Sequence, residues 1–413
     1  MVIAVVELDE GPRLITNIIE CDPEQVAVGM AVEAAFEKID DSDVVLPVFS
    51  RLLSDLGADV VKVEPPDGDS TRLHGKDIGG ISGFFNHQNA GKRNICLDLR
   101  AEGAIRLVKS MASKADIVIE NYRPGVMQRL GIDYPALQAV NPRLLMLSIS
   151  GYGQEGPEAH RPSYAPIVHA EAGLMHRLAA RNSTPPGDLP LSVADTNASL
   201  HGVIALLAAL HLRDQTGVGQ YIDMSMMDAT FVTDDRAHFD LEDTPDTLPI
   251  CPIYDLPFAR VFIATDLKLL FRRLHRRAGL ADPTPEGASL QEKVALREAA
   301  IEQRLMDCGS LTALTRLLDT LDLPWGVVRG PRELADQPTL KHRGMIAEVD
   351  DRAGGTRPIP QSPYRFSNAA SGVRGPTAHR GEHNQEVLRD WLDLNDKQMR
   401  DLFDGRILIN EKD

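Results

Sequence analysis

The sequence contains little of what marks disulfide-rich, metal-binding or membrane-spanning proteins. Its four cysteines, Cys21, Cys96, Cys251 and Cys308, lie far apart and form no CxxC or CxxH pair. Cysteines spaced in this way argue against a disulfide framework or a structural zinc site, so we expect reduced thiols and no metal. The chain has no uninterrupted apolar run of about 18 residues, and its opening MVIAVVELDEG lacks the basic start of a signal peptide. We therefore expect no membrane span and a cytoplasmic protein.

Basic residues are also fewer than acidic residues. The 44 Lys and Arg against 60 Asp and Glu give a formal net charge of −16. An electrostatic field of this sign repels nucleic acid and anionic membranes, so we expect neither as a partner. An anionic ligand would need a local cluster of basic side chains. The length of 413 residues predicts two or three folding units.

Residues 1–49 differ in pattern from the rest of the chain. Four short apolar segments, VIAVVEL, RLITNII, VEAAFE and VVLPVF, are separated by polar or turn-forming residues. This pattern is typical of short β-strands. We predict a piece of a small β-barrel in this region.

From Leu52 onward, apolar strand-like runs alternate with helical patterns. Such alternation predicts an α/β fold with a parallel sheet covered on both faces. The strand-like runs ADVVKVE, ADIVIE and RLLMLSIS lead into the polar, glycine- and proline-rich segments EPPDGDSTR, ENYRPG and SGYGQEGP. Because the carboxyl ends of parallel strands border the crevice where ligands bind, these three endings predict a binding site.

A long apolar helix is predicted over residues 196–212, and the strand YIDMSM follows it. Another predicted helix, LKLLFRRLHRRAGL, carries many basic residues. We interpret them as a solvated face or an intersubunit salt-bridge surface, with a contact to a phosphate group as the functional alternative. They are Lys268, Arg272, Arg273, His275, Arg276 and Arg277.

Several motifs, in their order along the chain, resemble the family III CoA-transferases, which include formyl-CoA and carnitine-type transferases and the related α-methylacyl-CoA racemases. The matching segments are LLSDLGADVVKVEPPDGDSTR, NAGKRNICLDL, ADIVIENYRPGVMQRLGIDY, LLMLSISGYGQEGP, SVADTNASLHGVIALLAALHLRDQTGVGQYIDMSMMD and GEHNQEVL. The resemblance implies a homodimer of two interlocked chains, each with a Rossmann-like large domain and a smaller α+β domain. It implies a large CoA-binding domain at 50–230, a small domain with linkers at 231–350, and a C-terminal segment at 351–413 that returns to the large domain.

The first 49 residues resemble the end of the acyl-CoA-associated OB-fold domain that accompanies thiolase-like proteins, which implies a partial OB-like segment and a thiolase-like partner. Family members open with a strand and a CoA-contacting loop before the segment that matches RLLSDLGADVVKVE. Both are expected to be missing here, which would expose sheet edges unless VVLPVF substitutes for the strand.

The resemblance implies that Asp195, in SVADTNASLHG, is the catalytic nucleophile. A carboxylate attacks the thioester of an acyl-CoA, forms an acyl-aspartyl anhydride and expels CoA thiolate, which then returns before a carboxylic acid acceptor takes over the CoA. From the residues alone, Asp195 precedes a predicted helix and could equally cap its N-terminus.

The resemblance also implies a binding site for CoA or acyl-CoA, with Asn121, Arg129 and Leu130 against the nucleotide and Gly151 and Tyr152 near the pantetheine and thioester. The nearest basic residues are candidates for the phosphates because of their charge, with a solvated surface position as the alternative for each. They are Lys92, Arg93, Arg123 and Arg129.

Two alternatives to a CoA-transferase remain. An acyl-CoA racemase or epimerase needs a second base, but Tyr164 occupies the position of the racemase histidine, and a phenol with a pKa of about 10 is a poor base. His160, His169 and His176 lie nearby in the sequence. The other alternative is a non-catalytic acyl-CoA-binding subunit of a thiolase-like complex.

A glycine-rich lid covers the nucleophile in many relatives of the family. The corresponding segment here, LPICPIYDLPFAR, contains no glycine. We expect a different lid or none, which would leave an anhydride more open to hydrolysis.

Overall fold

A computed structural model describes residues 2–7, 13–18, 47–247 and 251–410. The chain divides into two compact units, residues 1–42 and 43–413, which are treated separately below. In the first unit, strands β1 (Val2–Glu7) and β2 (Arg13–Ile18) pair antiparallel. The first two apolar runs of the sequence are therefore strands, as predicted. VEAAFE lies outside the described residues.

The predicted strand VVLPVF is wrong in its described part, because helix α1 (Pro47–Asp55) begins at its proline. Proline favours the first turn of a helix, where its missing N–H costs no hydrogen bond. The helical period of LPVFSRLLSD, with Leu53 in the core, outweighs the strand-like composition of the short segment.

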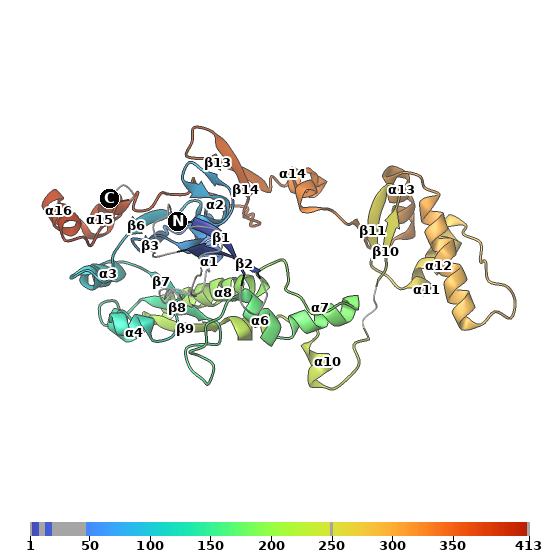
Figure 1. Cartoon of the computed structure of the whole chain (residues 1–413), viewed down its shortest axis with the longest axis horizontal. Helices are drawn as coiled ribbons and strands as arrows, with labels where there is room; N and C mark the ends of the chain where they lie inside the picture. Colours follow the sequence, from blue (N-terminus) through green and yellow to red (C-terminus); the bar gives the residue numbers. More distant parts are fainter. Residues whose placement is uncertain (1, 8–12, 19–46, 248–250, 411–413) are drawn as a thin grey trace. The chain divides into compact units, whose positions relative to one another are not determined.

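The second unit contains two parallel sheets (Figure 1). One pairs β3 (Val61–Glu64) with β6 (Arg93–Cys96), and the other has the order β7 (Ile117–Glu120), β8 (Leu145–Ser150), β9 (Gln220–Ser225). Every residue of β8 is buried, which accounts for its nearly continuous apolar sequence. The predicted parallel α/β architecture is confirmed.

The two sheets do not join among the described strands, since β3 pairs only with β6, and β7 only with β8. The amides of Arg93 and Leu97 in and after β6 donate to Val60 and Glu64, so even-numbered residues of β3 face β6. In parallel strands both backbone groups of a residue point to one side. Val61 and Val63 therefore direct theirs to the open edge, and by the same alternation Ile117 and Ile119 do so on β7.

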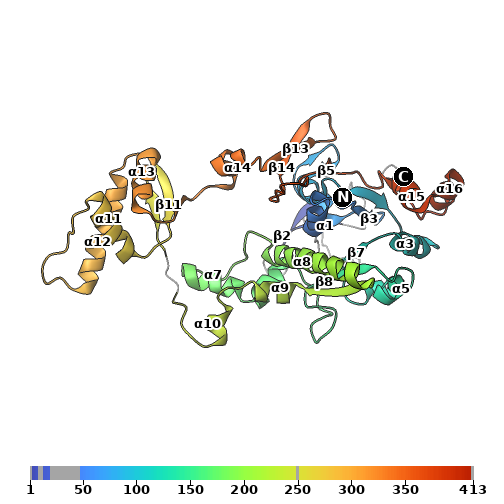
Figure 2. The same ribbon diagram turned by 180° about the vertical axis from the view of Figure 1, so that it is seen from behind.

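Helices cover both faces of these sheets. On one face, α1 and α8 (Val193–Thr216) share a buried cluster with Leu145, Leu147 and Ile149 of β8. Figure 2 shows α8 lying along the sheet. The helices of the other face are α3 (Ala104–Ala112), α4 (Val126–Leu130), α5 (Tyr134–Gln138), α15 (Asn384–Leu392) and α16 (Asp396–Asp404).

Helix α8 is long and apolar enough to cross a membrane by length and composition. Its contacts explain the composition differently, because Ala198, Val203 and Leu206 belong to the buried cluster against β8. We therefore interpret α8 as a core helix.

The remaining elements of this part of the chain are short and connect or border the sheets. They are α2 (Gly83–Asn89), α6 (Ala165–Glu171), α7 (Leu174–Asn182), α9 (Met226–Val232), α10 (Ala237–Leu241), α14 (Pro338–His342), β4 (Asp77–Ile78), β5 (Ile81–Ser82), β13 (Ile346–Asp350), β14 (Thr356–Pro360) and the 3-10 helices η2 (Ser70–Leu73) and η3 (Pro331–Asp336).

Residues 253–327 form a group with its own hydrophobic core. It contains the antiparallel strands β10 (Ile253–Leu256), β11 (Ala259–Ile263) and β12 (Trp325–Val327), and the helices α11 (Leu267–Ala278), α12 (Leu290–Met306) and α13 (Leu311–Leu321). The described part of LPICPIYDLPFAR thus contains β10 and the start of β11 rather than a free loop, and residues 248–250 lie outside the description.

The basic helix α11 buries Leu270, Phe271 and Leu274 in this core. Arg273 and Arg277 approach Asp322 at 3.7 and 3.8 Å, so part of its charge is compensated within the same group.

Candidate active site

Asp195 lies inside the first turn of α8. The helix begins at Val193, three residues earlier than predicted, and Ser192 is its N-cap. The N-cap interpretation of Asp195 is therefore wrong, because an N-cap stands before the helical residues. The polar residues of SVAD do not predict a helix. The helix starts earlier than predicted because Ala194 is buried in the core.

The carboxyl group of Asp195 is in an unusual electrostatic state. Its side chain is half-buried, and its Oδ1 atom is sealed from solvent without a hydrogen-bond partner among the described residues. Burial raises the pKa of Asp195 from 3.8 to about 7. A buried carboxyl oxygen without a hydrogen-bond donor is poorly solvated. The ionised form of Asp195 is therefore high in free energy, which favours its reaction as a nucleophile.

The first turn of α8 lies against the carboxyl end of β8. Ala194, the residue before Asp195, shares a buried cluster with Ile149 of β8, Val168 of α6 and Met226 of α9. The residues that follow β8 are Gly151 and Tyr152, the predicted pantetheine contacts. The structure thus places the strand ending predicted to contact the thioester beside the helix that carries the predicted nucleophile.

Gly151 is required by close packing. A Cβ atom at this position would lie 2.4 Å from the Cβ of Ser163, and the Gly151 carbonyl accepts a hydrogen bond from the Met227 amide at 3.0 Å. The glycine lets the β8 ending, the residues before α6 and the start of α9 meet, which holds the loop in place.

Several buried hydroxyl groups in this region have no partner among the described residues. Buried polar groups in proteins are nearly always hydrogen-bonded, so a group of exceptions suits a polar ligand. They are the hydroxyls of Ser150, Tyr152, Ser163, Ser199 and Thr230. Sequence reasoning singled out only Tyr152 among these residues.

The predicted nucleotide contacts lie at the end of β7 and in α4. Asn121 follows β7 directly and is half-buried, as is Leu130, while Arg129 is exposed on α4. Gly125, with a φ of 84°, forms the turn that starts this helix. Burial raises the pKa of the neighbouring Glu120 to about 7, against hydrogen bonds from Ser148 and the Tyr122 amide.

The three basic candidates have different environments. Lys92 is 4% exposed, donates to Asn89 at 2.8 Å, and its pKa is lowered well below the usual value by burial. Arg93 forms ion pairs with the carboxylates of Asp59, Glu386 and Asp390 at 2.5, 3.2 and 2.7 Å. Arg123 is half-buried after β7. The roles of all three in phosphate binding stay predictions.

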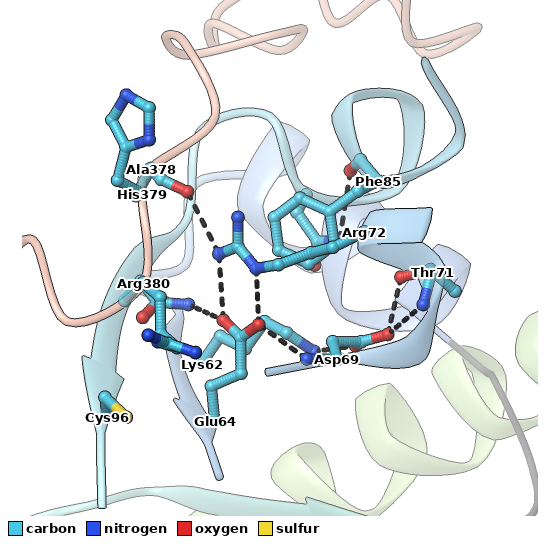
Figure 3. A network of polar contacts seen from close by, with 12 residues as sticks. Lys62, Glu64, Asp69, Thr71, Arg72, Phe85, Cys96, Ala378, His379 and Arg380 are labelled. Carbon is cyan, nitrogen blue, oxygen red and sulfur yellow. Dashed lines mark hydrogen bonds and ion pairs between the residues drawn. The ribbon is translucent and has the colours of Figure 1, made fainter. Parts of the chain in front are cut away.

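Sequence reasoning missed a buried ionic network at the end of β3 (Figure 3). The side chain of Glu64 is fully buried and receives Nε and Nη2 of Arg72 at 2.5 and 2.9 Å. Burial would raise the pKa of Glu64, but Arg72 and its other donors hold it below the usual value. The guanidinium of Arg72 also stacks 3.8 Å from the centre of the Phe85 ring. This network anchors the segment EPPDGDSTR to its strand.

The histidines near the site do not supply an obvious second base. Tyr164, at the racemase histidine position, is the N-cap of α6 and 47% exposed. His160 and His176 are exposed, whereas both ring nitrogens of the buried His169 have partners. No group of three or more potential metal ligands occurs within the residues that the structure describes.

Comparisons with known proteins agree with this geometry. Residues 42–384 match the sequence model described as CoA-transferase family III, and residues 1–37 match that of the ChsH2 C-terminal OB-fold domain. The chain is therefore a member of the CoA-transferase family III, and it is a CoA-transferase enzyme.

Two curated relatives and one solved structure illustrate the similarity. The beta subunit of succinyl-CoA–L-malate CoA-transferase from Chloroflexus aurantiacus is 30% identical over 91% of this chain and 98% of its own length. The acetyl-CoA:oxalate CoA-transferase of Acetobacter aceti is 42% identical over 45% of this chain and 48% of its own. A CAIB/BAIF family protein from Brucella suis superposes with a TM-score of 0.72 at 29% identity, covering 84% of this chain and 95% of that one.

Proposed function

We propose that the enzyme moves CoA from an acyl-CoA donor to a small carboxylic acid, with Asp195 as the nucleophile. A carboxylate oxygen of Asp195 attacks the thioester carbonyl carbon, the C–S bond breaks, and CoA leaves as the thiolate. The thiolate then attacks the Asp195 acyl carbon of the mixed anhydride, which releases the donor acid and leaves an aspartyl-CoA thioester. The acceptor carboxylate attacks the Asp195 acyl carbon of this thioester, which expels CoA thiolate and forms a second mixed anhydride. The thiolate then attacks the acyl carbon of the acceptor, which forms the new acyl-CoA and releases the Asp195 carboxylate.

The observation that carries this proposal is Oδ1 of Asp195 in the first turn of α8, which is sealed from solvent and has no hydrogen-bond partner within the part of the chain that the structure describes. A structural carboxylate at a helix start normally accepts backbone N–H groups, and hydrogen bonds to the charged form lower the pKa. Here burial raises the pKa to about 7 instead. The relatives add support, since their names assign CoA transfer between carboxylic acids.

Hydroxylamine trapping tests the proposal. Incubation with an acyl-CoA and hydroxylamine should release CoA and convert Asp195 to a hydroxamate, which peptide mass spectrometry locates. Asp195→Ala should abolish both signals. Asp228→Asn is the matched control, because Asp228 is also an acidic residue in the first turn of a helix but is exposed.

The alternatives give different signals in the same experiment. CoA transfer that persists in Asp195→Ala would refute the proposal. Exchange of an α-deuterium without CoA transfer would indicate a racemase or epimerase. Tight CoA binding with neither reaction would indicate a non-catalytic subunit.

We also propose a homodimer. One face of α8 exposes Leu200, Ile204 and Leu207 to 41, 63 and 49%. These positions follow helical spacing and form a continuous apolar stripe, which favours burial against another surface. Ile204→Glu should therefore reduce the mass measured by light scattering from dimer to monomer, while Ile204→Val should not.

Two further assignments stay proposals. We propose a cytoplasmic location, which agrees with the wide spacing of the four cysteines in the sequence. The OB-fold match at residues 1–37 supports a thiolase-like partner, which co-purification with and without these residues would test.

A further inference from the structure

The first turn of α8 has an unusual cap. The N-cap residue Ser192 makes no side-chain hydrogen bond to the helix. The amide of Ala194, two residues into the turn, donates instead to Nε2 of His169 on α6 at 3.2 Å. A side chain from another helix therefore does what an N-cap side chain usually does.

This contact fixes the tautomer of His169. Because the Ala194 amide can only donate, Nε2 must accept and the proton of the neutral ring must lie on Nδ1. Nδ1 is 3.0 Å from Oδ1 of Asp188, which can accept that proton in a hydrogen bond. The same bond lowers the pKa of Asp188 and keeps it ionised.

The hydrogen bonds of His169 link Asp188 to Ala194, which is the residue directly before Asp195. The side chain of His169 is 1% exposed, and that of Asp188 is 45% exposed. His169 accepts the hydrogen bond of the Ala194 amide, so the residue directly before Asp195 is held in place. No hydrogen bond from a described residue to Oδ1 holds the carboxyl group of Asp195 in place.

We propose that His169, oriented by Asp188, is a positioning residue that aims Asp195 at the thioester. This inference rests on the proposed function and adds a residue to it. Nucleophilic attack requires the reacting atoms about 3 to 3.5 Å apart and aligned, and a displacement of about 1 Å can cost a hundredfold in rate. His169 does not touch the substrate in this role. It holds the first turn of α8 in place, and the position of this turn determines where the Asp195 carboxylate lies.

Two variants of similar size separate acceptance of the hydrogen bond from filling of the space. In His169→Gln, the side-chain oxygen can accept from Ala194 and the amide can donate to Asp188, so activity should stay close to that of the wild type. His169→Met fills the same space without these groups. Its kcat should fall about ten- to a hundredfold with the KM for acyl-CoA unchanged, because the defect lies in aiming and not in binding.

The matched control is the same pair of substitutions at His176, an exposed histidine of α7, where neither should change kcat. A spectroscopic measurement is independent of folding defects in the variants. The ¹⁵N chemical shifts of His169 in the wild-type protein should place the ring proton on Nδ1, and Asp188→Ala should weaken this preference.

A His169→Met enzyme with wild-type kcat, or a wild-type ring protonated on Nε2, would overturn the inference. Failure of the proposed function looks different, because Asp195→Ala would then keep its activity. Loss of activity in Asp195→Ala together with an unaffected His169→Met would refute the positioning role alone.

Discussion

The raised pKa of Asp195 predicts that the nucleophile destabilises its own fold at neutral and alkaline pH. The folded-state pKa of about 7 lies about 3 units above the value of 3.8. At about 1.4 kcal/mol per unit, the ionised carboxylate would cost the folded state up to about 4 kcal/mol. Because the side chain is only half-buried, we expect about 2 to 4 kcal/mol.

The sign follows from proton binding. Between pH 3.8 and about 7 the folded state keeps the Asp195 proton while the unfolded state loses it, so stability falls as pH rises through this window. Below it the effect vanishes, and above it the destabilisation is complete. Asp195→Asn has the same shape without the charge. The variant should therefore melt at a higher temperature than the wild type, by a margin that is small near pH 4 and largest near pH 8.

Calorimetric melting temperatures of both proteins across this pH range test the reasoning, with Asp228→Asn as the control in an exposed helix start. Melting temperature is the better observable here, since a protein with more than one core need not unfold in two states. A difference between wild type and Asp195→Asn that is independent of pH, or that has the opposite sign at pH 8, would refute it.

Three further outcomes follow from the site and its supports. The rate of Asp195 hydroxamate formation should rise with pH to a plateau above about 7, because only the ionised carboxylate attacks, and a flat profile from pH 5 to 8 would contradict this. Gly151→Ala should lower kcat about tenfold or more, since its Cβ would clash with Ser163, and Ser163→Gly in the same chain should restore part of the activity. Arg72→Met should lower the stability measured in urea by about 3 to 5 kcal/mol because it leaves the buried Glu64 unpaired, whereas a loss below about 1 kcal/mol would show that Glu64 takes up its proton or another partner.

The positions of the strands along the chain and their parallel arrangement could be predicted, because hydrophobic period and turn residues are local signals and alternation with helices is typical of parallel sheets. ADVVKVE, ADIVIE and RLLMLSIS all contain the expected strands β3, β7 and β8. The start of α8 could not, since it depends on the burial of Ala194 and on the acceptor that His169 supplies from another helix. VVLPVF was misinterpreted because short apolar runs fit both periods.

The site shows the same division. The type and position of Asp195 follow from the motif around it, but its missing hydrogen bond and raised pKa come from the surroundings. Lys92 and Arg93 were chosen for their charge, which the sequence shows. The sequence does not show that one is buried beside Asn89 and the other is held by three carboxylates.

The unpaired sides of β3 and β7 among the described strands predict uneven protection of the backbone amides in the two parallel sheets. In an unbroken α/β sheet the innermost amides are the last to exchange with deuterium, because neighbours hold them on both sides. Among the described strands, the backbone groups of Val61, Val63, Ile117 and Ile119 point to the unpaired sides of β3 and β7. Their amides should exchange earlier than those of β8, which is bonded on both sides.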